Sequence, residues 1–427
     1  MKYCLLFLVG LLSFTSNAED GFDDDGFDET PIDIVVQVED APGTLYGSVD
    51  LEAHYNLSND KNLSSLKTLV DVLGDYKFEN GVNLSGNLKG YHDFIYDLEN
   101  RTVPNGYKND INLNELNIEL EISPNLDFKT GRQVIVWGKS DSIRITDILN
   151  PLDNRTPGLV DIKNLRLGRT MSKLDYYKDG YNASAILIHE NRFSENPMQF
   201  SDFKPTAINK PINTPDDSLD NTTVALSLTG AFSGYDFGLY YADTYLDKPY
   251  LTNNNTTLDY NNKSTMIGAA YNQAIDSYLF KAEAAHFDNI QYNGVTDTKA
   301  RTDIMIGVEY TGITDGSIGY EVAVRKIHDY DSLINVESNG FKPENEYQQV
   351  ARFSQSYLNQ TLDLSAVASV VGLRGEDGGS IRLELDYAID DQRSVSGGVI
   401  DYIGGDNSVI DAYKDNDRLF TKLSYAF

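Results

Sequence analysis

The sequence contains little cysteine, proline and methionine, and it has no long apolar run. Its one cysteine, Cys4, lies at the extreme N-terminus, so the rest of the chain can form no disulfide and has no thiol chemistry. After residue 18, no stretch approaches the ~20 apolar residues that a membrane-spanning helix needs. No segment shows a convincing 3.6-residue periodicity, which soluble multidomain enzymes usually contain. These absences favour an exported β-rich protein over a helical membrane protein or a soluble enzyme.

Basic residues are also scarce, because 35 lysines and arginines stand against 65 aspartates and glutamates. The formal net charge of −30 argues against nucleic-acid binding, since phosphate binding needs clustered Lys and Arg. No phosphate-binding glycine loop and no cluster of metal ligands stands out in the sequence, so no cofactor is predicted.

The N-terminus has the features of an export signal. Lys2 precedes an apolar run from Cys4 to Leu12, and Ser16-Asn17-Ala18 is a small-x-small cleavage site. This run is too short for a membrane anchor helix, which is the competing interpretation. We therefore expect a signal peptide over residues 1–18 that is cleaved after Ala18.

Residues 19–44 form an acidic leader, in which GFDDD at 21–25 is echoed by GFDE at 26–29. Because blocks of like charge repel each other and do not pack, the leader is predicted to be a disordered periplasmic tail. Two alternatives remain, a calcium site or a docking peptide for a periplasmic partner within residues 19–33. The spacing lacks the distal glutamate of an EF-hand loop, which weakens the calcium alternative.

From residue 45 onward, apolar and polar residues alternate with a period of two, which is typical of β-strands. In the first segment Leu45, Val49 and Leu51 share one face, and Asp50 and Glu52 share the other. Over the later segments the polar face carries both charge signs, which a dry core would not tolerate. The pattern predicts strands with an apolar face toward lipid and a polar face toward a wet lumen.

The alternation predicts eighteen strands over residues 45–427, connected by short and long links in turn. The predicted strands are 45–56, 65–78, 80–95, 110–122, 125–137, 169–178, 180–190, 220–230, 233–245, 262–273, 276–287, 300–312, 315–327, 345–358, 361–373, 379–390, 393–404 and 416–427. Short periplasmic turns and long external loops are the rhythm of a transmembrane antiparallel β-barrel. An even strand number places both ends of the chain in the periplasm.

The last strand supports the same interpretation. Leu419, Leu423, Tyr425 and Phe427 share its outward face, and Phe427 ends the chain. A terminal aromatic residue on an alternating strand resembles the signal that the outer-membrane barrel-assembly machinery reads. We therefore expect the cell outer membrane as the location, with lipid and lipopolysaccharide around the barrel.

The most distinctive segment is GRQVIVWGKSD at 131–141, which is followed by NPLD at 150–153. Trp137 is predicted to end a strand at the membrane interface. The connection 138–168 is then the third external loop, which in many porins folds into the barrel and narrows it. Ile143, Ile145 and other apolar residues of this loop favour an inward position over an outward loop in contact with lipopolysaccharide.

Mixed charge on such a loop would set a transverse field and a size limit across the pore. The sequence thus predicts a porin-like channel for passive diffusion of a small solute, with selectivity set by the charged inward loop. The candidate pore-lining and constriction residues are Arg132, Asp141, Arg144, Asp147, Asp153, Arg155, Glu309, Glu321, Arg325, Arg382 and Glu384.

The run of Gly-Arg-Gln, Trp-Gly, Ser-Asp, Arg and Asn-Pro-x-Asp within 131–153 resembles Gram-negative outer-membrane proteins of the DUF1302 type. More broadly, the chain looks like substrate-specific porins, which also place Gly-Arg-Gln before a long loop. The resemblance implies an outer-membrane channel, with organic or hydrophobic solutes as the expected class, and gives no specific substrate.

Two other functions compete with the channel. A non-conducting binding or docking barrel, such as an adhesin or a partner of a periplasmic export or uptake complex, is favoured slightly by the acidic leader. An enzyme would place His328 with Asp329 and Asp331 at an external strand end, as outer-membrane proteases place His and Asp. A histidine in a polar loop is more often simply solvated, so we predict no enzymatic activity.

Overall fold

The computed structural model describes residues 42–58, 61–99, 101, 106–198, 201–203, 210–252, 256–336 and 342–427. The predicted signal peptide, the cleavage site after Ala18 and the acidic leader up to residue 41 lie outside the described residues. In the described part of the chain, no helix is long and apolar enough to cross a membrane.

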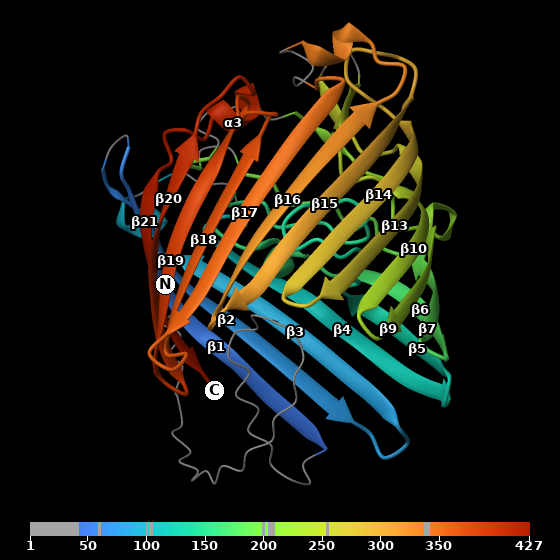
Figure 1. The fold of residues 1–427 in the computed structure, drawn as a ribbon, viewed down its shortest axis with the longest axis horizontal. Coiled ribbons are helices and arrows are strands. Elements are labelled where there is room, and N and C mark those ends of the chain that lie inside the picture. The colour runs from blue at the N-terminus through green and yellow to red at the C-terminus, as the bar shows by residue number, and fades with distance from the viewer. Residues whose placement is uncertain are drawn as a thin grey trace, which may run out of the picture. The chain divides into compact units, whose positions relative to one another are not determined.

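Eighteen antiparallel strands form one sheet that closes on itself, which confirms the predicted fold (Figure 1). They are β1 (Gly43–Asn56), β2 (Leu63–Lys77), β3 (Val82–Asp93), β4 (Asn109–Ser123), β5 (Leu126–Gln133), β6 (Arg169–Lys178), β7 (Tyr181–Ile188), β9 (Thr223–Phe232), β10 (Tyr235–Tyr245), β13 (Lys263–Ile275), β14 (Tyr278–Ile290), β15 (Lys299–Ile313), β16 (Gly316–Ile327), β17 (Asn345–Tyr357), β18 (Leu362–Val371), β19 (Gly378–Asp390), β20 (Arg393–Ile403) and β21 (Arg418–Ala426). Each pairs with the next along the chain, and β1 pairs with β21.

The long connections carry the remaining elements. The short strands β8 (Ile212–Asn213), β11 (Tyr250–Thr252) and β12 (Thr257–Asp259) form a small separate sheet. The helical pieces are α1 (Ile95–Leu98), α2 (Ile162–Leu165), α3 (Ser408–Asp411) and the 3₁₀ turns η1 (Leu219–Asn221) and η2 (Ser332–Asn335).

The two faces of the sheet follow the alternation of the sequence. Leu51, Ile306 and Leu383 lie on the outward face, where each is more than 40% exposed. Their neighbours along the strands, such as Glu52 and Glu384, point inward. Apolar side chains that cover the outside of a closed sheet suit a lipid environment, and polar side chains within suit an aqueous lumen.

The turns at one end of the barrel are tight, as the sequence predicts. Between β6 and β7 the chain turns through Asp179 and Gly180, whose φ angles are +52° and +83°. Two successive residues with positive φ make the type I′ geometry, whose twist matches that of the paired strands. The opposite end carries the long loops, among them residues 134–168.

The barrel closes where β1 meets β21. Register pairs run from Ser48 with Ala426 to Asn56 with Arg418. Beyond the last pair, Gly47 and Phe427 exchange both backbone hydrogen bonds, at 2.9 and 3.0 Å. Phe427 is 43% exposed on the outward face, where the sequence places it.

Candidate functional site

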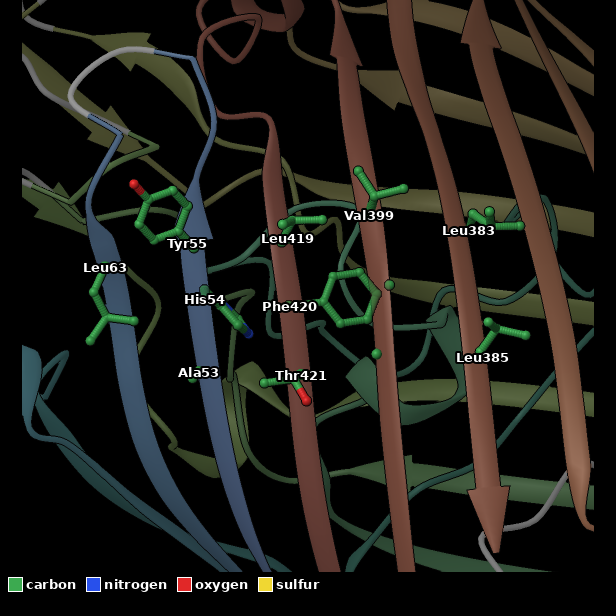
Figure 2. Close-up of a pocket in the computed structure, with 12 residues that line it drawn as sticks. Ala53, His54, Tyr55, Leu63, Leu383, Leu385, Val399, Leu419, Phe420 and Thr421 are labelled. Atoms are coloured by element: carbon green, nitrogen blue, oxygen red, sulfur yellow. The ribbon is translucent and has the colours of Figure 1, made fainter.

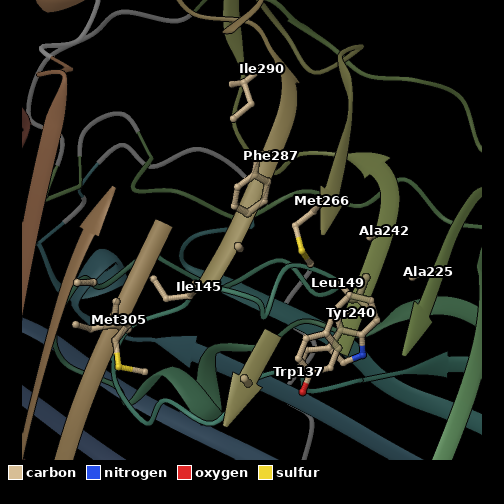
Figure 3. Close-up of a cluster of buried hydrophobic side chains, with 14 of the residues drawn as sticks. Trp137, Ile145, Leu149, Ala225, Tyr240, Ala242, Met266, Phe287, Ile290 and Met305 are labelled. Atoms are coloured by element: carbon tan, nitrogen blue, oxygen red, sulfur yellow. The ribbon is translucent and has the colours of Figure 1, made fainter. Parts of the chain in front are cut away.

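The third external loop, residues 134–168 between β5 and β6, folds into the barrel. Its residues Ile143, Ile145 and Leu149 are at most 2% exposed. They belong to one apolar cluster with inward side chains of β6, β7, β9, β10 and β13 to β17. Figure 3 shows Ile145 and Leu149 within this cluster, among Met266, Phe287 and Met305. The loop therefore has its own apolar core against one side of the lumen, because burial of its isoleucines and leucines stabilises that position.

Trp137 is part of this core and does not sit at the membrane interface. The ladder of β5 ends at Gln133, so the chain leaves the wall before it reaches Trp137. The indole is 5% exposed and stacks on Tyr240 of β10, with ring centroids 4.8 Å apart. The N–H of Gly138 donates to the Tyr240 hydroxyl at 3.2 Å. The predicted interfacial position of Trp137 is wrong, since the alternation runs on for four residues after strand pairing has stopped.

Glu283 of β14 fastens the first part of the loop to the wall. Its Oε1 accepts the N–H groups of Lys139 at 2.5 Å and Ser140 at 2.7 Å. Its Oε2 accepts the N–H of Thr146 at 3.1 Å and the Thr146 hydroxyl at 2.8 Å. The carboxylate is 3% exposed, and a buried carboxylate is tolerated only when such donors satisfy it.

Glu321 of β16 makes a second attachment two strands away. Its Oε2 accepts the Ser140 hydroxyl at 2.7 Å and the N–H of Ser142 at 3.1 Å, and its Oε1 accepts the N–H of Asp141 at 3.0 Å. Lys281 of β14 forms ion pairs with Asp141 and, at 3.3 Å, with Glu309 of β15. Lys139 also pairs with Asp236 of β10 at 3.4 Å. The wall thus holds residues 139–146 through backbone N–H groups, two hydroxyl groups and two salt bridges.

The two ends of the loop are tied together within the loop itself. The Asn150 side chain accepts the N–H of Ile135 at 2.8 Å and donates to the carbonyl of Leu167 at 2.8 Å. Asp147 forms ion pairs with Arg144 at 3.2 Å and Arg166 at 2.9 Å. These contacts fix the shape of the loop. Because Arg144 and Asp147 pair with each other, their charges are balanced within the loop.

Arg155 joins the loop to the strands β3 and β4. Its guanidinium pairs with Asp153 at 2.6 Å, Asp110 at 2.9 Å and Glu195 at 3.3 Å, and donates to the Tyr91 hydroxyl at 3.0 Å. Burial by itself would lower the pKa of Arg155, but the hydrogen bonds and charge of Asp153 outweigh burial and raise it. This arginine therefore stays charged and holds three carboxylates together.

Asp161 attaches the loop to the strands that follow β16 around the wall. It pairs with Arg382 of β19 and, at 3.7 Å, with Arg352 of β17. The Tyr402 hydroxyl on β20 donates to the carbonyl of Pro157 at 2.5 Å. Burial would raise the pKa of the Asp161 carboxyl, but the charges of Arg382 and Arg352 outweigh burial and lower it. With contacts to β14 and β16, to β3 and β4, and to β17, β19 and β20, the loop crosses the lumen.

Comparison with known proteins agrees with this architecture. The family described as "Protein of unknown function (DUF1302)" matches residues 49–427. The chain belongs to the DUF1302 family. No curated protein shows significant sequence similarity to this DUF1302 chain.

Solved porin structures share the fold of the DUF1302 barrel. OccAB1 of Acinetobacter baumannii has 12% identity and a TM-score of 0.54, with 90% of this chain and 96% of that chain covered. OccK2 (OpdF) of Pseudomonas aeruginosa, solved with glucuronate, has 11% identity and a TM-score of 0.53, with 90% and 97% covered. The outer membrane protein OpdK of Pseudomonas aeruginosa, solved with vanillate, has 9% identity and a TM-score of 0.51, with 90% and 98% covered. At these identities the likeness shows an outer-membrane porin fold.

In the DUF1302 barrel most sequence-predicted site residues lie in or around the lumen, and many form ion pairs with other residues of the protein. Asp141, Arg144, Asp147, Asp153 and Arg155 lie on the loop, and Glu309, Glu321, Arg325, Arg382 and Glu384 lie on the inward face of the wall. Arg325 lies 3.5 Å from Glu346, and Arg382 lies 3.8 Å from Glu384. Glu321 and Arg382 hold the loop, a role that the sequence prediction did not give them.

Arg132 is the exception, because it faces outward. Its register partner on β4 is Leu116, which is 48% exposed on the outward face. The guanidinium pairs with Glu190 and donates to the carbonyl of Leu113 at 3.1 Å. The predicted place of Arg132 in the lumen is therefore wrong. Its neighbour Gln133 is the residue that points inward.

Sequence reasoning missed Glu283, Lys281 and Arg352. The available signal was weak, since each occupies an inward position on a predicted strand and resembles any other polar lumen residue. Only the contacts with residues 139–146 and with Asp161 distinguish these three.

The histidine that the enzymatic alternative requires also has a structural partner. His328 hydrogen bonds the Thr302 hydroxyl at 2.8 Å, and His286 contacts the same hydroxyl at 2.9 Å. Among the described residues, no three His, Cys, Asp or Glu side chains are grouped to hold a metal ion.

Proposed function

We propose that this protein is an outer-membrane channel for passive diffusion of a small solute, in which residues 134–168 form the constriction. The observation that carries the proposal is the loop inside the barrel, fastened to β14 and β16 by Glu283 and Glu321 and to β3 and β4 across the lumen by Arg155. A porin fold with an inward loop supports a narrow aqueous passage. The export signal over residues 1–18, with cleavage after Ala18, is part of the same proposal.

The wall beside the loop favours positively charged solutes. Strands β1 to β5 carry more inward carboxylates than ammonium groups. The inward acids are Asp50, Glu52, Asp71, Asp75, Asp93, Asp110, Glu115, Glu119, Glu121 and Asp127, and the inward lysines are Lys67, Lys77, Lys89 and Lys129. Because Lys89 pairs with Asp71 and Lys129 pairs with Glu119, the remaining wall charge is negative. A lumen lined mainly by one sign of charge attracts ions of the other sign.

The solute class therefore differs from what the solved porins suggest. OccK2 and OpdK were solved with glucuronate and vanillate, and both ligands are carboxylates. A carboxylate would meet repulsion along the acidic wall of β1 to β5 in this protein. We expect small cations and neutral solutes to pass more readily than small anions.

The test is single-channel conductance of the refolded protein in a planar bilayer, with and without residues 138–168. A stable conductance that rises when the loop is removed supports an open channel with an inward constriction. Shortening of the connection 372–377 between β18 and β19 is a suitable control, because its residues form none of the attachments described above. A silent barrel in all three forms would refute the channel.

A second candidate is a non-conducting binding or docking barrel. The many contacts that hold the loop across the lumen favour it, since a firmly filled lumen suits a barrel that does not conduct. Deletion of the acidic leader distinguishes the two functions. It should leave conductance unchanged in a channel and should abolish activity in a barrel that docks a periplasmic partner through residues 19–33.

A further inference from the structure

The outward wall of the barrel carries an apolar groove of about 490 Å³ across the seam at which the barrel closes. Figure 2 shows the lining side chains on five neighbouring strands, β2, β1, β21, β20 and β19. The floor consists of the small residues Ala53, Thr421 and Gly397. Large apolar side chains, including Tyr55, Leu419, Val399, Leu383 and Leu385, stand around the floor.

The strand register explains why a groove forms at this place. Ala53 pairs with Thr421, and Thr421 pairs with Gly397, so three small residues form one row across β1, β21 and β20. The next outward row toward the external end is Tyr55, Leu419, Val399 and Leu383, whose members are register partners in that order. A row of small side chains beside a row of large ones leaves a trough across the strands.

Gly397 is not required by the packing of the barrel. A Cβ atom at Gly397 would have its nearest neighbour, the carbonyl oxygen of Phe420, at 3.6 Å, an ordinary contact distance. At the adjacent Gly398, in contrast, a Cβ atom would lie 2.4 Å from the Phe420 ring. Glycine within a strand weakens the strand, and where no steric reason requires it, it can mark a site at which a ligand comes close. The missing side chain at 397 is what gives the groove its depth.

The surroundings identify the class of ligand. The outward apolar face of an outer-membrane barrel contacts lipid acyl chains, and the groove is continuous with that face. Its row of large residues, Tyr55, Leu419, Val399 and Leu383, lies in the external halves of the strands, and the adjoining row of small residues reaches the middle of β21 and β20. The external half of the wall faces the outer leaflet, which in Gram-negative bacteria consists of lipopolysaccharide.

We propose that the groove binds one acyl chain of a lipopolysaccharide molecule. The chain lies in the row formed by Ala53, Thr421 and Gly397, across the β1–β21 seam. Because the occupant contacts both strands of the seam, it also stabilises barrel closure. This inference depends on the outer-membrane location of the barrel and is independent of whether the lumen conducts.

The experiment uses the full-length mature protein, extracted from outer membranes in mild detergent. Gly397→Leu fills the trough with a side chain. Gly90→Leu is the matched control, because Gly90 is another outward strand glycine, and a Cβ atom there would have its nearest neighbours at 3.5 and 3.7 Å. Native mass spectrometry measures bound lipopolysaccharide, and added lipopolysaccharide should raise the unfolding temperature. We expect the wild type and Gly90→Leu to retain one molecule, and Gly397→Leu to lose at least fivefold in occupancy and the thermal shift.

A second variant keeps the test decisive if Gly397→Leu does not fold. Ala53→Leu fills the same row from β1 and should have the same effect on occupancy. Equal lipopolysaccharide retention by the wild type and by a folded filled-groove variant would overturn the inference. So would phospholipid in place of lipopolysaccharide, or a dimer of the wild type that the filling variants disrupt, because each identifies a different occupant.

Discussion

The Glu283→Gln substitution tests whether one wall residue holds the loop across the lumen. Glutamine has the same shape as glutamate, but one oxygen is replaced by an NH₂ group. That group would face either the N–H groups of Lys139 and Ser140 or the two donors of Thr146. Toward Lys139 and Ser140, two accepted hydrogen bonds become donor–donor contacts. Toward Thr146, one does, because the hydroxyl can turn and accept, and the remaining hydrogen bonds lose their charged acceptor.

The size of the effect follows from these contacts. A hydrogen bond to a charged group contributes roughly 1.5–3 kcal/mol, so the loss of one or two, together with the loss of charge at the others, costs about 3–6 kcal/mol of loop docking. Water that enters the lumen can satisfy the freed N–H groups, which favours the lower end of this range. A change of ~3 kcal/mol shifts the ratio of docked to released loop about a hundredfold.

The assay is single-channel recording of Glu283→Gln in a planar bilayer. We expect either a larger open-channel conductance or frequent transitions to a larger conductance level. Glu119→Gln is the matched control, since Glu119 is an inward carboxylate on β4 that pairs with Lys129 and does not contact the loop. If a folded Glu283→Gln protein conducted like the wild type and like Glu119→Gln, the anchoring role of Glu283 would be refuted.

Three other predictions concern the loop and the wall. Trp137 is the only tryptophan and is buried, so its fluorescence should be protected from both a water-soluble quencher and brominated lipid. In Glu283→Gln it should shift to the red and become accessible to the water-soluble quencher. Quenching by lipid would contradict its position against Tyr240. The Asp161 carboxylate has a lowered pKa in the docked loop, so its contribution is complete above the ordinary value of about 3.9 and is lost as the pH falls through the lowered pKa. The part of the conductance change that Asp161 causes should therefore appear only below about pH 4, and Asp161→Asn should lack this part because its loop contact is already lost at neutral pH. In a salt gradient the reversal potential should indicate cation preference, and the triple variant Asp50→Asn, Asp75→Asn and Glu121→Gln should reduce it; an anion-selective wild type would refute the role of the acidic wall.

The barrel itself could be read from the sequence, because a strand with one face toward lipid and one toward water must alternate. All eighteen predicted strands are present, and most boundaries agree within three residues. The clearest difference is β5, which ends at Gln133 where the prediction continued to Trp137. Alternation depends only on which side each residue faces, and it persists past the end of backbone pairing, so it does not mark that end.

The candidate site depended on tertiary structure. The apolar residues Ile143 and Ile145 indicated that the loop turns inward, since they need a core to cover them. The sequence contained no information on which wall residues would meet the loop, because Glu283, Glu321 and Glu119 are equivalent as inward carboxylates on alternating strands. Strand order and loop path bring Glu283 and Glu321 to residues 139–146, and leave Glu119 beside Lys129. The sequence by itself thus determined the fold and the two faces of its wall, and three-dimensional proximity alone decided which charges hold the loop and which line the passage.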